Sequence, residues 1–440
     1  MIIRKSTVMQ YALLYLMAIF NGGVLYPFLQ SDMPGALKMV INAIVILGIL
    51  AFLFRKGKYG NPYCVVMSGF LLFSVILVRY TVGGVGISAL MEYLVCIMLA
   101  YLSVCVDKEN YATRMINFVY CFALISVFCY FIQLIAPDIL RAFFKPFNST
   151  FAYNDWSAAA YGGSVVNRSY TAWGKYFFTM RNGEMSRNLG IFTEPGNYQI
   201  VLNSALFVLM FFPELCDYSQ KQLKRRFIVL VTALLTCQST SGYLIFLSFC
   251  IAFFFSQSRY KNMSGIRRIV VTIILVALGV LVIDYNIRGN QSLLNTAIIS
   301  KLFNDGSLDV AASSGYWRLG TIGTAIVLMI THPFGAGFDT TFSTIQGQLA
   351  GSAGGALMAF GAALGIIPFI ATIVWHIKPI IRDRRLDIPA KVAFAIMYFQ
   401  ISFAQTKVFY PFLVAIAVLV VVTSRDELYR EEQVSSLEEV

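Results

Sequence analysis

Apolar runs of roughly 18 to 23 residues recur along the whole chain, and they constrain the fold more than any other feature. Two clear examples are 36–54 and 115–136, where apolar and polar residues do not alternate. Alternation over about ten residues is what a transmembrane β-barrel requires, so that class is excluded. Only 13% of the residues are charged, whereas a soluble domain carries about 25%. The sequence therefore predicts an all-α polytopic membrane protein.

We predict about twelve transmembrane helices with both termini in the cytoplasm. The apolar stretches 227–255 and 390–423 are each interrupted by polar residues, and each is interpreted as a hairpin of two helices. A single crossing at 227–255 would carry the basic residues of 259–268 to the outside, against the positive-inside rule. The other spans are expected near 8–29, 37–54, 62–78, 85–106, 115–136, 197–212, 269–286 and 352–374.

The net charge of +12 could indicate a nucleic-acid or anionic-lipid partner, but this topology explains the basic residues, because it places most of the 34 Lys and Arg on the inner side. Basic clusters such as 224–226 are therefore interpreted as topological signals, and no nucleic-acid partner is expected. Carboxylates on the outer side are scattered, without the spacing of a divalent-ion site, so no metal is predicted. No nucleotide-binding loop is present either, and no cofactor is expected.

The whole chain, 1–440, is expected to form one integral membrane domain with two large segments on its outer face. The first is 137–196 and the second is 287–351, and loops of that length are usually functional or disordered. Aromatic residues between Phe143 and Phe178 argue against disorder in the first. They fit an interfacial element anchored by its rings, and equally platforms on which sugars stack.

Charged residues mark the point where the first outer segment re-enters the predicted membrane. Arg187 and Glu194 lie seven residues apart, and Pro195 and Gly196 follow Glu194 directly. Charges at such a place cost desolvation energy unless they are paired or used. One interpretation is a mutual ion pair that fixes the segment, and the other is a binding or catalytic site.

Further arginines and a histidine come from the outer segments. A guanidinium group suits a pyrophosphate because its planar fork donates two hydrogen bonds and does not deprotonate. Arg187, Arg288 and Arg318 are therefore candidates for a diphosphate site, with Arg181 as a further one. His332 is one of only two histidines, and it is a candidate general base or phosphate contact unless its role is structural.

These residues resemble a known family. Gly190-Ile-Phe-x-Glu194-Pro with Arg187 upstream, the 238–242 hairpin tip, and Arg318 followed by His332-Pro-x-Gly-x-Gly are similar to the O-antigen polymerase and ligase superfamily. The resemblance covers the order of spans, both large outer segments and about residues 185–375.

The resemblance implies a polymerase of surface-polysaccharide repeat units in the bacterial inner membrane, with its active site facing the periplasm. The donor and the acceptor would be undecaprenyl-pyrophosphate-linked saccharides, and the transfer would be inverting and metal-independent. Arg187, Arg318, Arg288 and Arg181 would bind pyrophosphate or glycan, and Glu194 or His332 would act on the acceptor hydroxyl. Membrane lipid, a chain-length regulator and a flippase are the partners that the family implies.

Two alternatives accompany this interpretation. A ligase shares the chemistry, but ligases of the superfamily carry a His in the helix after the second segment, and 351–356 contains none. A flippase or secondary transporter would place its polar groups at mid-membrane, where Glu92 is the clearest ionisable residue. For Glu92 an interhelical contact is favoured over a proton relay. The glycine pairs of 351–365 indicate faces for close helix packing.

Overall fold

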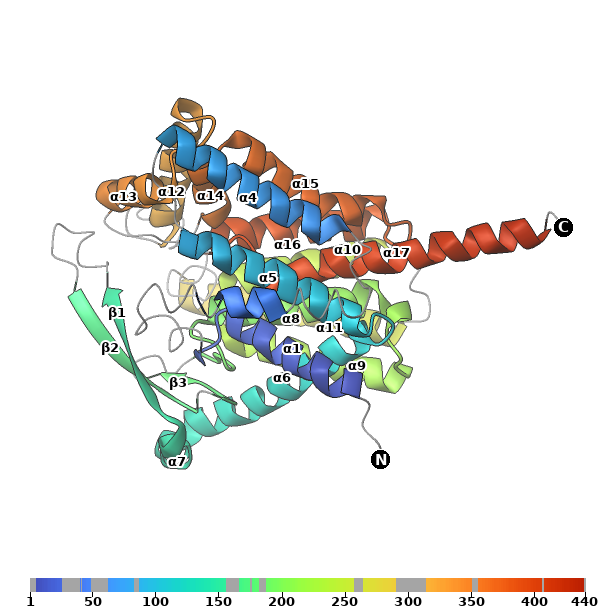
Figure 1. The fold of residues 1–440 in the computed structure, drawn as a ribbon. Coiled ribbons are helices and arrows are strands. Elements are labelled where there is room, and N and C mark those ends of the chain that lie inside the picture. Colours follow the sequence, from blue (N-terminus) through green and yellow to red (C-terminus); the bar gives the residue numbers. More distant parts are fainter. Residues whose placement is uncertain are drawn as a thin grey trace.

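The computed structural model describes residues 5–25, 40, 42–48, 62–82, 87–155, 166–174, 176–181, 187–256, 264–289, 314–349, 355–405 and 407–438. Within these ranges the chain is predominantly α-helical, which confirms the predicted helical class. The long helices lie side by side as a bundle (Figure 1). They are α1 (Lys5–Phe20), α4 (Pro62–Val82), α5 (Ile87–Val106), α6 (Tyr111–Ile135), α8 (Pro195–Phe211), α9 (Gln220–Cys237), α10 (Thr240–Phe255), α11 (Ser264–Arg288), α15 (Ile366–Arg382), α16 (Ile388–Ala404) and α17 (Pro411–Glu438).

The two interrupted apolar stretches each form two helices, as predicted. Gln238 adopts a left-handed conformation (φ 51°) and ends α9, and α10 begins at Thr240. Residues 405–410 likewise separate α16 from α17. The first span differs from its prediction, because α1 ends at Phe20 instead of continuing towards 29. Gly22, with φ 101°, turns the chain there. Residues 26–29 lie outside the described ranges.

Basic residues gather at the end of the bundle where α1, α9 and α16 begin and α15 ends, which we call the basic end. Those described there are Lys5, Lys108, Arg114, Lys221, Lys224, Arg225, Arg226, Arg268, Lys378, Arg382, Arg384, Arg385 and Lys391. The opposite end is where α8, α10 and α17 begin and where the only strands in the described part of the chain lie, and we call it the sheet end. In Figure 1 the sheet end is on the left and both chain termini point to the right.

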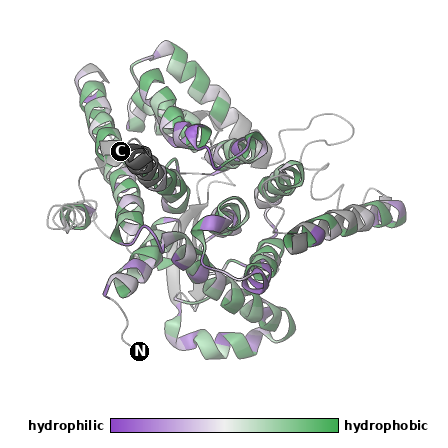
Figure 2. Cartoon of the chain, turned by 90° about the vertical axis from the view of Figure 1, so that its right-hand side faces the viewer, coloured by the Kyte–Doolittle hydropathy of each residue, from purple (hydrophilic) through white to green (hydrophobic). Residues whose placement is uncertain are grey.

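Helices α8 and α17 form the centre of the core. Every residue of α8 from Tyr198 to Phe211 is buried, as is the run Phe412–Val420 of α17. The outer helices instead expose large apolar side chains, for example Phe73, Phe128 and Phe255. Figure 2 views the basic end and shows apolar residues on the helices at the periphery. Such extensive exposed apolar surface is uncommon on soluble monomers.

One helix in the described ranges, α6, is by length and composition able to cross a membrane, and its mean hydropathy reaches 2.3. Shorter apolar helical stretches accompany it: Val65–Tyr80, Leu90–Val106, Thr240–Phe255, Gly320–Thr331, Ile388–Ala404 and Pro411–Ser424. A helix rises 1.5 Å per residue, so about 20 residues cross the hydrocarbon core of a bilayer. The predicted count of about twelve spans therefore remains a prediction.

The first outer segment contains a small sheet, which the sequence interpretation did not include. After α7 (Pro137–Phe144) and a short 3₁₀ turn, β1 (Ser149–Asp155) pairs antiparallel with β2 (Val166–Trp173), and β2 pairs with β3 (Met180–Arg181). Figure 1 shows β1 and β2 projecting from the bundle. The aromatic rings divide into two groups: Phe144 and Phe178 are buried, whereas Phe143 and Phe177 are exposed.

The second outer segment contains a helical hairpin of α12 (Ser314–Thr331) and α13 (Phe338–Leu349). Its turn hydrogen-bonds to the last turn of α14 (Ala356–Leu364) and to the start of α15: Ala336 N donates to Ala362 O (2.8 Å), and Ile366 N donates to Pro333 O (2.9 Å). Gly365, with φ 101°, breaks the predicted span 352–374 at this point.

Glycines allow this close packing, but of the predicted helix-face glycines that the structure describes only Gly361 lies within a helix, whereas Gly355 and Gly365 flank α14 with positive φ. A Cβ on Gly365 would lie 2.6 Å from Pro333 O, and one on Gly361 would lie 2.5 Å from Met329 Sδ. Gly355 similarly lies against Thr321 of α12. Gly351, the fourth predicted member, is outside the described ranges.

Candidate functional site

The segment 187–197 lies at the sheet end and is fixed to the turn that follows α1. Val24 N donates to Ile191 O (2.9 Å), and Thr193 N donates to Gly22 O (3.1 Å). The segment therefore has a defined backbone although most of it precedes α8, which begins at Pro195. The turn after α1, which is more than 160 residues away in sequence, holds it in place.

Asn188 fixes the same segment to the helices behind it, and its side chain is fully buried. Its Nδ2 donates to Thr236 Oγ1 (2.9 Å) and to Ser126 Oγ (3.2 Å), and its Oδ1 accepts the N–H of Gly190 (3.0 Å). Ser126 also shares a hydrogen bond with the Tyr198 hydroxyl (2.7 Å). One neutral amide thus joins the segment to α6 and α9, with all its polar atoms satisfied, and Ser126 extends the contact to Tyr198 of α8.

Gly190 lets the segment pass close to α8. Its φ is +57°, and a Cβ there would lie 2.9 Å from the Tyr198 ring. On the other side of the turn, the Phe192 ring stacks on Tyr198 with centroids 5.4 Å apart. The Gly190-Ile-Phe part of the motif is therefore explained by backbone conformation and ring packing.

Glu194 is the N-cap residue of α8. Its carbonyl accepts hydrogen bonds from Asn197 N (3.1 Å) and Tyr198 N (3.3 Å), and its side chain is exposed. Pro195 occupies the first turn, where no N–H is needed. The partial positive charge at the start of a helix favours a carboxylate at this position. Glu194 therefore presents its charge at the surface of the sheet end.

Arg187 lies at the other end of the segment and is half-buried. It is close enough to Tyr243, near the start of α10, for its charge to act on that hydroxyl. Arg187 and Glu194 both interact with other groups of the chain. The segment thus carries a guanidinium and a carboxylate on a backbone held by neutral side chains.

Arg181 belongs to the same neighbourhood through its backbone. It ends β3, and Thr179, just before that strand, donates its N–H to Gly190 O (2.6 Å). The structure thus brings the strand of Arg181 beside the segment of Arg187 and Glu194, while the Arg181 side chain lies outside the described part.

The remaining predicted residues lie on other elements. Arg288 ends α11 and pairs with Asp284 of the same helix (3.3 Å). Arg318 lies in α12, and only its backbone is described. His332 follows that helix, is exposed, and shares a hydrogen bond with Thr331 Oγ1 through Nδ1 (2.9 Å). Arg318 and His332 thus belong to the hairpin of α12 and α13, which packs on α14, and no described contact joins them to the segment 187–197.

Lys407 and Glu92 form an ion pair at the sheet end that the sequence did not predict. Lys407 Nζ lies 2.9 Å from Glu92 Oε1, and the two side chains are 15% and 19% exposed. Nζ also donates to Phe20 O (3.1 Å), where α1 carries the negative end of its dipole. The contact joins α5, α1 and the loop before α17, which agrees with the interhelical interpretation of Glu92.

Two buried amides on α8 were also missed by the sequence interpretation. Asn203 Nδ2 donates to Gln199 Oε1 (2.8 Å), and neither side chain is exposed. Gln199 Nε2 and Asn203 Oδ1 have no hydrogen-bond partner within the described part of the chain. Polar residues four apart in an otherwise apolar run were the available signal, because buried polar groups are costly unless bonded.

The described residues contain no group of three or more His, Cys, Asp or Glu side chains placed to hold a metal ion. Comparison of the chain with protein families, with curated proteins and with solved structures gives no match. The chemistry of the site therefore has to be argued from its own residues.

Proposed function

We propose that the chain is a polytopic protein of the bacterial inner membrane with about twelve spans, its basic end in the cytoplasm and its sheet end facing the periplasm. Two observations support this: basic residues gather at one end of the bundle, and large apolar side chains cover its periphery. Both chain termini lie toward the basic end in Figure 1, which agrees with cytoplasmic termini.

We propose further that the protein polymerises oligosaccharide repeat units carried on undecaprenyl pyrophosphate. The observation that carries this proposal is the fixed segment 187–197, which holds Arg187 and Glu194 at the sheet end. A preorganised cation near a pyrophosphate and a carboxylate near a hydroxyl are what glycosyl transfer from such a donor needs. The resemblance of the surrounding residues to the O-antigen polymerase and ligase superfamily points to the same reaction.

In the proposed reaction the bond between the anomeric carbon of the growing glycan and its phosphate oxygen breaks. A hydroxyl of the terminal sugar on a second lipid-linked unit forms the new glycosidic bond, and its proton passes to Glu194 or His332. The pyrophosphate leaves with its negative charge stabilised by Arg187 and Arg318, and by Arg288 and Arg181 as further contacts. The protein mainly positions two substrates and neutralises charge, so no metal or cofactor is part of the proposal.

A transporter or flippase is the second candidate, favoured by one observation. Glu92 and Lys407 form a partly buried ion pair between helices, and ionisable residues in such places often belong to transport paths. The pair also stabilises the end of α1, which is a sufficient structural role. A ligase has the same donor chemistry and differs only in its acceptor.

The test is gel profiling of lipid-linked and surface glycans in cells that lack the gene and in cells that carry it again. A polymerase predicts capped single repeats on deletion and a restored ladder on complementation. Full-length polymer stranded on the lipid carrier would indicate a ligase, and repeats trapped at the cytoplasmic face would indicate a flippase.

Variants locate the activity within the molecule. Arg187→Ala and Arg318→Ala should each abolish the ladder while membrane levels stay normal, and Glu194→Gln should do so if Glu194 rather than His332 accepts the proton. The matched control is Arg141→Ala in α7, because Arg141 pairs with exposed Asp138 at the same end of the molecule. Normal chain lengths in both arginine variants would refute the site assignment. Activity that survives EDTA is expected, and loss that magnesium or manganese reverses would refute metal independence.

A further inference from the structure

An open groove of about 710 Å³ lies at the basic end between α4, α15 and α17, on the far side of the molecule from the segment 187–197. This volume falls within the range of about 300–1,000 Å³ that small-molecule sites usually have. Its walls are mainly apolar, with Met67 and Phe70 on α4, Trp375 on α15 and Val421 on α17 among the lining residues.

The α15 wall changes from apolar to basic along its length. Ala371 and Val374 line the groove first, and Lys378 and Arg382 follow at successive turns towards the basic end. Both cations are exposed, and neither belongs to an ion pair of the described residues. A ligand lying along α15 would therefore meet an apolar wall and then two positive charges.

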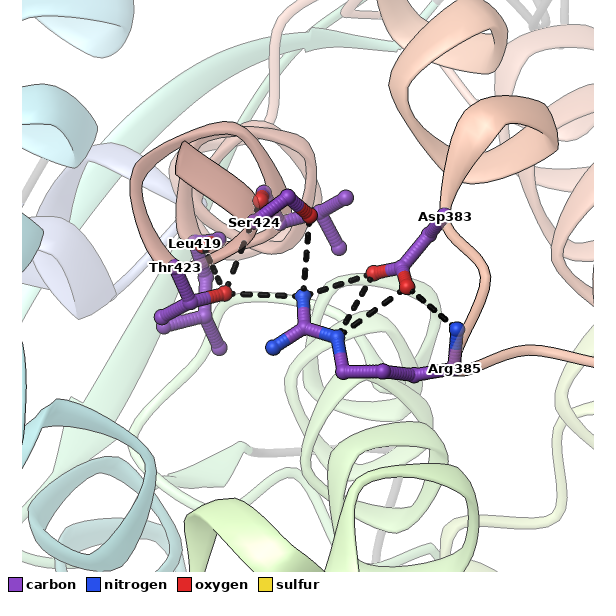
Figure 3. Close-up of polar contacts among 6 residues, drawn as sticks. Asp383, Arg385, Leu419, Thr423 and Ser424 are labelled. Carbon is purple, nitrogen blue, oxygen red and sulfur yellow. Dashed lines mark hydrogen bonds and ion pairs between the residues drawn. The ribbon is translucent and has the colours of Figure 1, made fainter. Parts of the chain in front are cut away.

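The carboxylate in the groove wall is already neutralised. Asp383 Oδ2 lies 2.6 Å from Arg385 Nη2, and that nitrogen also donates to Thr423 Oγ1 (2.8 Å) and Ser424 Oγ (3.3 Å) on α17 (Figure 3). Asp383 therefore does not repel an anion bound by Lys378 and Arg382. The same contacts hold the end of α15 to α17 and keep the groove formed.

We propose that this groove binds an anionic phospholipid of the inner leaflet, with an acyl chain between α4, α15 and α17 and the phosphate at Lys378 and Arg382. Apolar walls with a cationic rim complement such a lipid, whereas a zwitterionic lipid gains less from the two charges. The inference rests only on the membrane location in the proposed function and is independent of glycan transfer.

Trp375 provides a direct readout because it lines the groove. A full-length variant with Trp156, Trp173 and Trp317 changed to Phe has Trp375 as its one tryptophan. This variant is reconstituted into two series of phosphatidylcholine vesicles. One series contains increasing mole fractions of brominated phosphatidylglycerol, and the other contains the same mole fractions of brominated phosphatidylcholine. Brominated phosphatidylglycerol should quench Trp375 at lower mole fraction, by up to about fivefold for each cation.

The variant Lys378→Gln/Arg382→Gln should lose this preference. Lys221→Gln/Lys224→Gln is the matched control, because it removes the same charge from exposed positions on α9 at the same end of the bundle. Soluble glycerol phosphate should not reduce the quenching, because the acyl chain contributes to binding. Ala371→Phe, which adds a ring to the apolar wall, should weaken quenching by both brominated lipids.

Equal quenching by the two lipids, equal loss in both double variants, or displacement by glycerol phosphate would each overturn the proposal. Vesicle flotation separates this failure from failure of the proposed function. Protein that floats with the vesicles without lipid preference refutes the groove site alone, and protein that does not float refutes the membrane location as well.

Discussion

The two ends of the bundle are held together by different kinds of contact. At the basic end, charged groups join the helices: Arg385 pairs with buried Asp383, and Arg114 pairs with Asp107 at 2.7 Å. Arg226 lies over the Tyr218 ring, 4.0 Å from its centroid. Several of the interactions that connect helix ends there thus involve an arginine whose charge already has a partner.

At the sheet end, neutral groups do most of this work. Asn188 joins the segment 187–197 to α6 and α9 through its amide, and Thr193 and Asn21 join the segment to the turn after α1. The Lys407 and Glu92 pair is the described exception. Neutral contacts thus hold the backbone of this segment, on which Arg187 and Glu194 lie. The comparison teaches that charged groups take part in the described contacts between helix ends mainly at one end of the bundle, and neutral groups mainly at the other.

The variant Asp383→Ala should have the largest effect on the free energy of unfolding, and it tests whether charge is structural at the basic end. The change leaves Arg385 charged and buried, and breaking a buried pair in this way costs about 3–5 kcal/mol. We expect a large loss in the free energy of unfolding, measured in detergent by denaturant titration. Polymer formed per folded molecule should stay unchanged, because the proposed site is at the opposite end.

Asp138→Ala is the control for that variant. Asp138 also pairs with an arginine, Arg141, but its side chain is 89% exposed, so the expected loss is only about 0–1 kcal/mol. Similar losses in the two variants would show that the Asp383 contact is no more structural than a surface pair. Loss of activity in folded Asp383→Ala protein would contradict the separation of the two ends.

Asn188→Leu should lower polymer formation more than it lowers stability, the opposite of Asp383→Ala. The change removes the hydrogen bonds to Thr236 and Ser126 and leaves the N–H of Gly190 buried without its acceptor, at a cost of about 2–3 kcal/mol. Polymer formation should nevertheless fall far more than in Asp383→Ala, because Arg187 loses its neighbouring anchor. Ladder intensity normalised to folded protein measures this effect.

Asn286→Leu serves as the matched control, since Asn286 is an exposed asparagine near the end of α11. It should leave both stability and polymer nearly unchanged. If Asn188→Leu retained full activity despite its lower stability, the fixed segment would not be what positions the site.

The sequence was sufficient for the helical class and for the two breaks at 238 and 405–410, because apolar run length and interrupting polar residues are local signals. The break after Gln238 and the close packing of Gly361 followed from such patterns. The sheet of the first outer segment was not predicted, since the aromatic pattern there suited an interface equally well. The break of α14 from α15 at Gly365 depends on contact with Pro333, which is distant in sequence.

The candidate site was predicted only in part, for a related reason. Arg187 and Glu194 were identified because charges stand out in an apolar sequence. Asn188 was not identified, because a single amide carries no signal until Ser126 and Thr236 are known to face it. The partner of Glu92, Lys407, lies more than 300 residues away and likewise required the fold.

The smallest expected effect concerns a cysteine at the basic end. Cys216 lies in the loop before α9, where burial, and then the nearby Glu214 charge, raise the pKa of its thiol to about 12, although Arg226 opposes the shift. The reactive thiolate is thus scarce at neutral pH, and its fraction should rise about tenfold per pH unit below that pKa. Maleimide labelling of a variant that keeps only Cys216 should therefore still accelerate at pH 10, where an ordinary thiol has levelled off. Arg226→Gln should slow labelling further by raising the pKa, whereas Lys221→Gln, on the exposed face of α9, should not. A plateau near pH 9 would mean that Cys216 is exposed, and would contradict the close packing of the loop before α9 at the basic end.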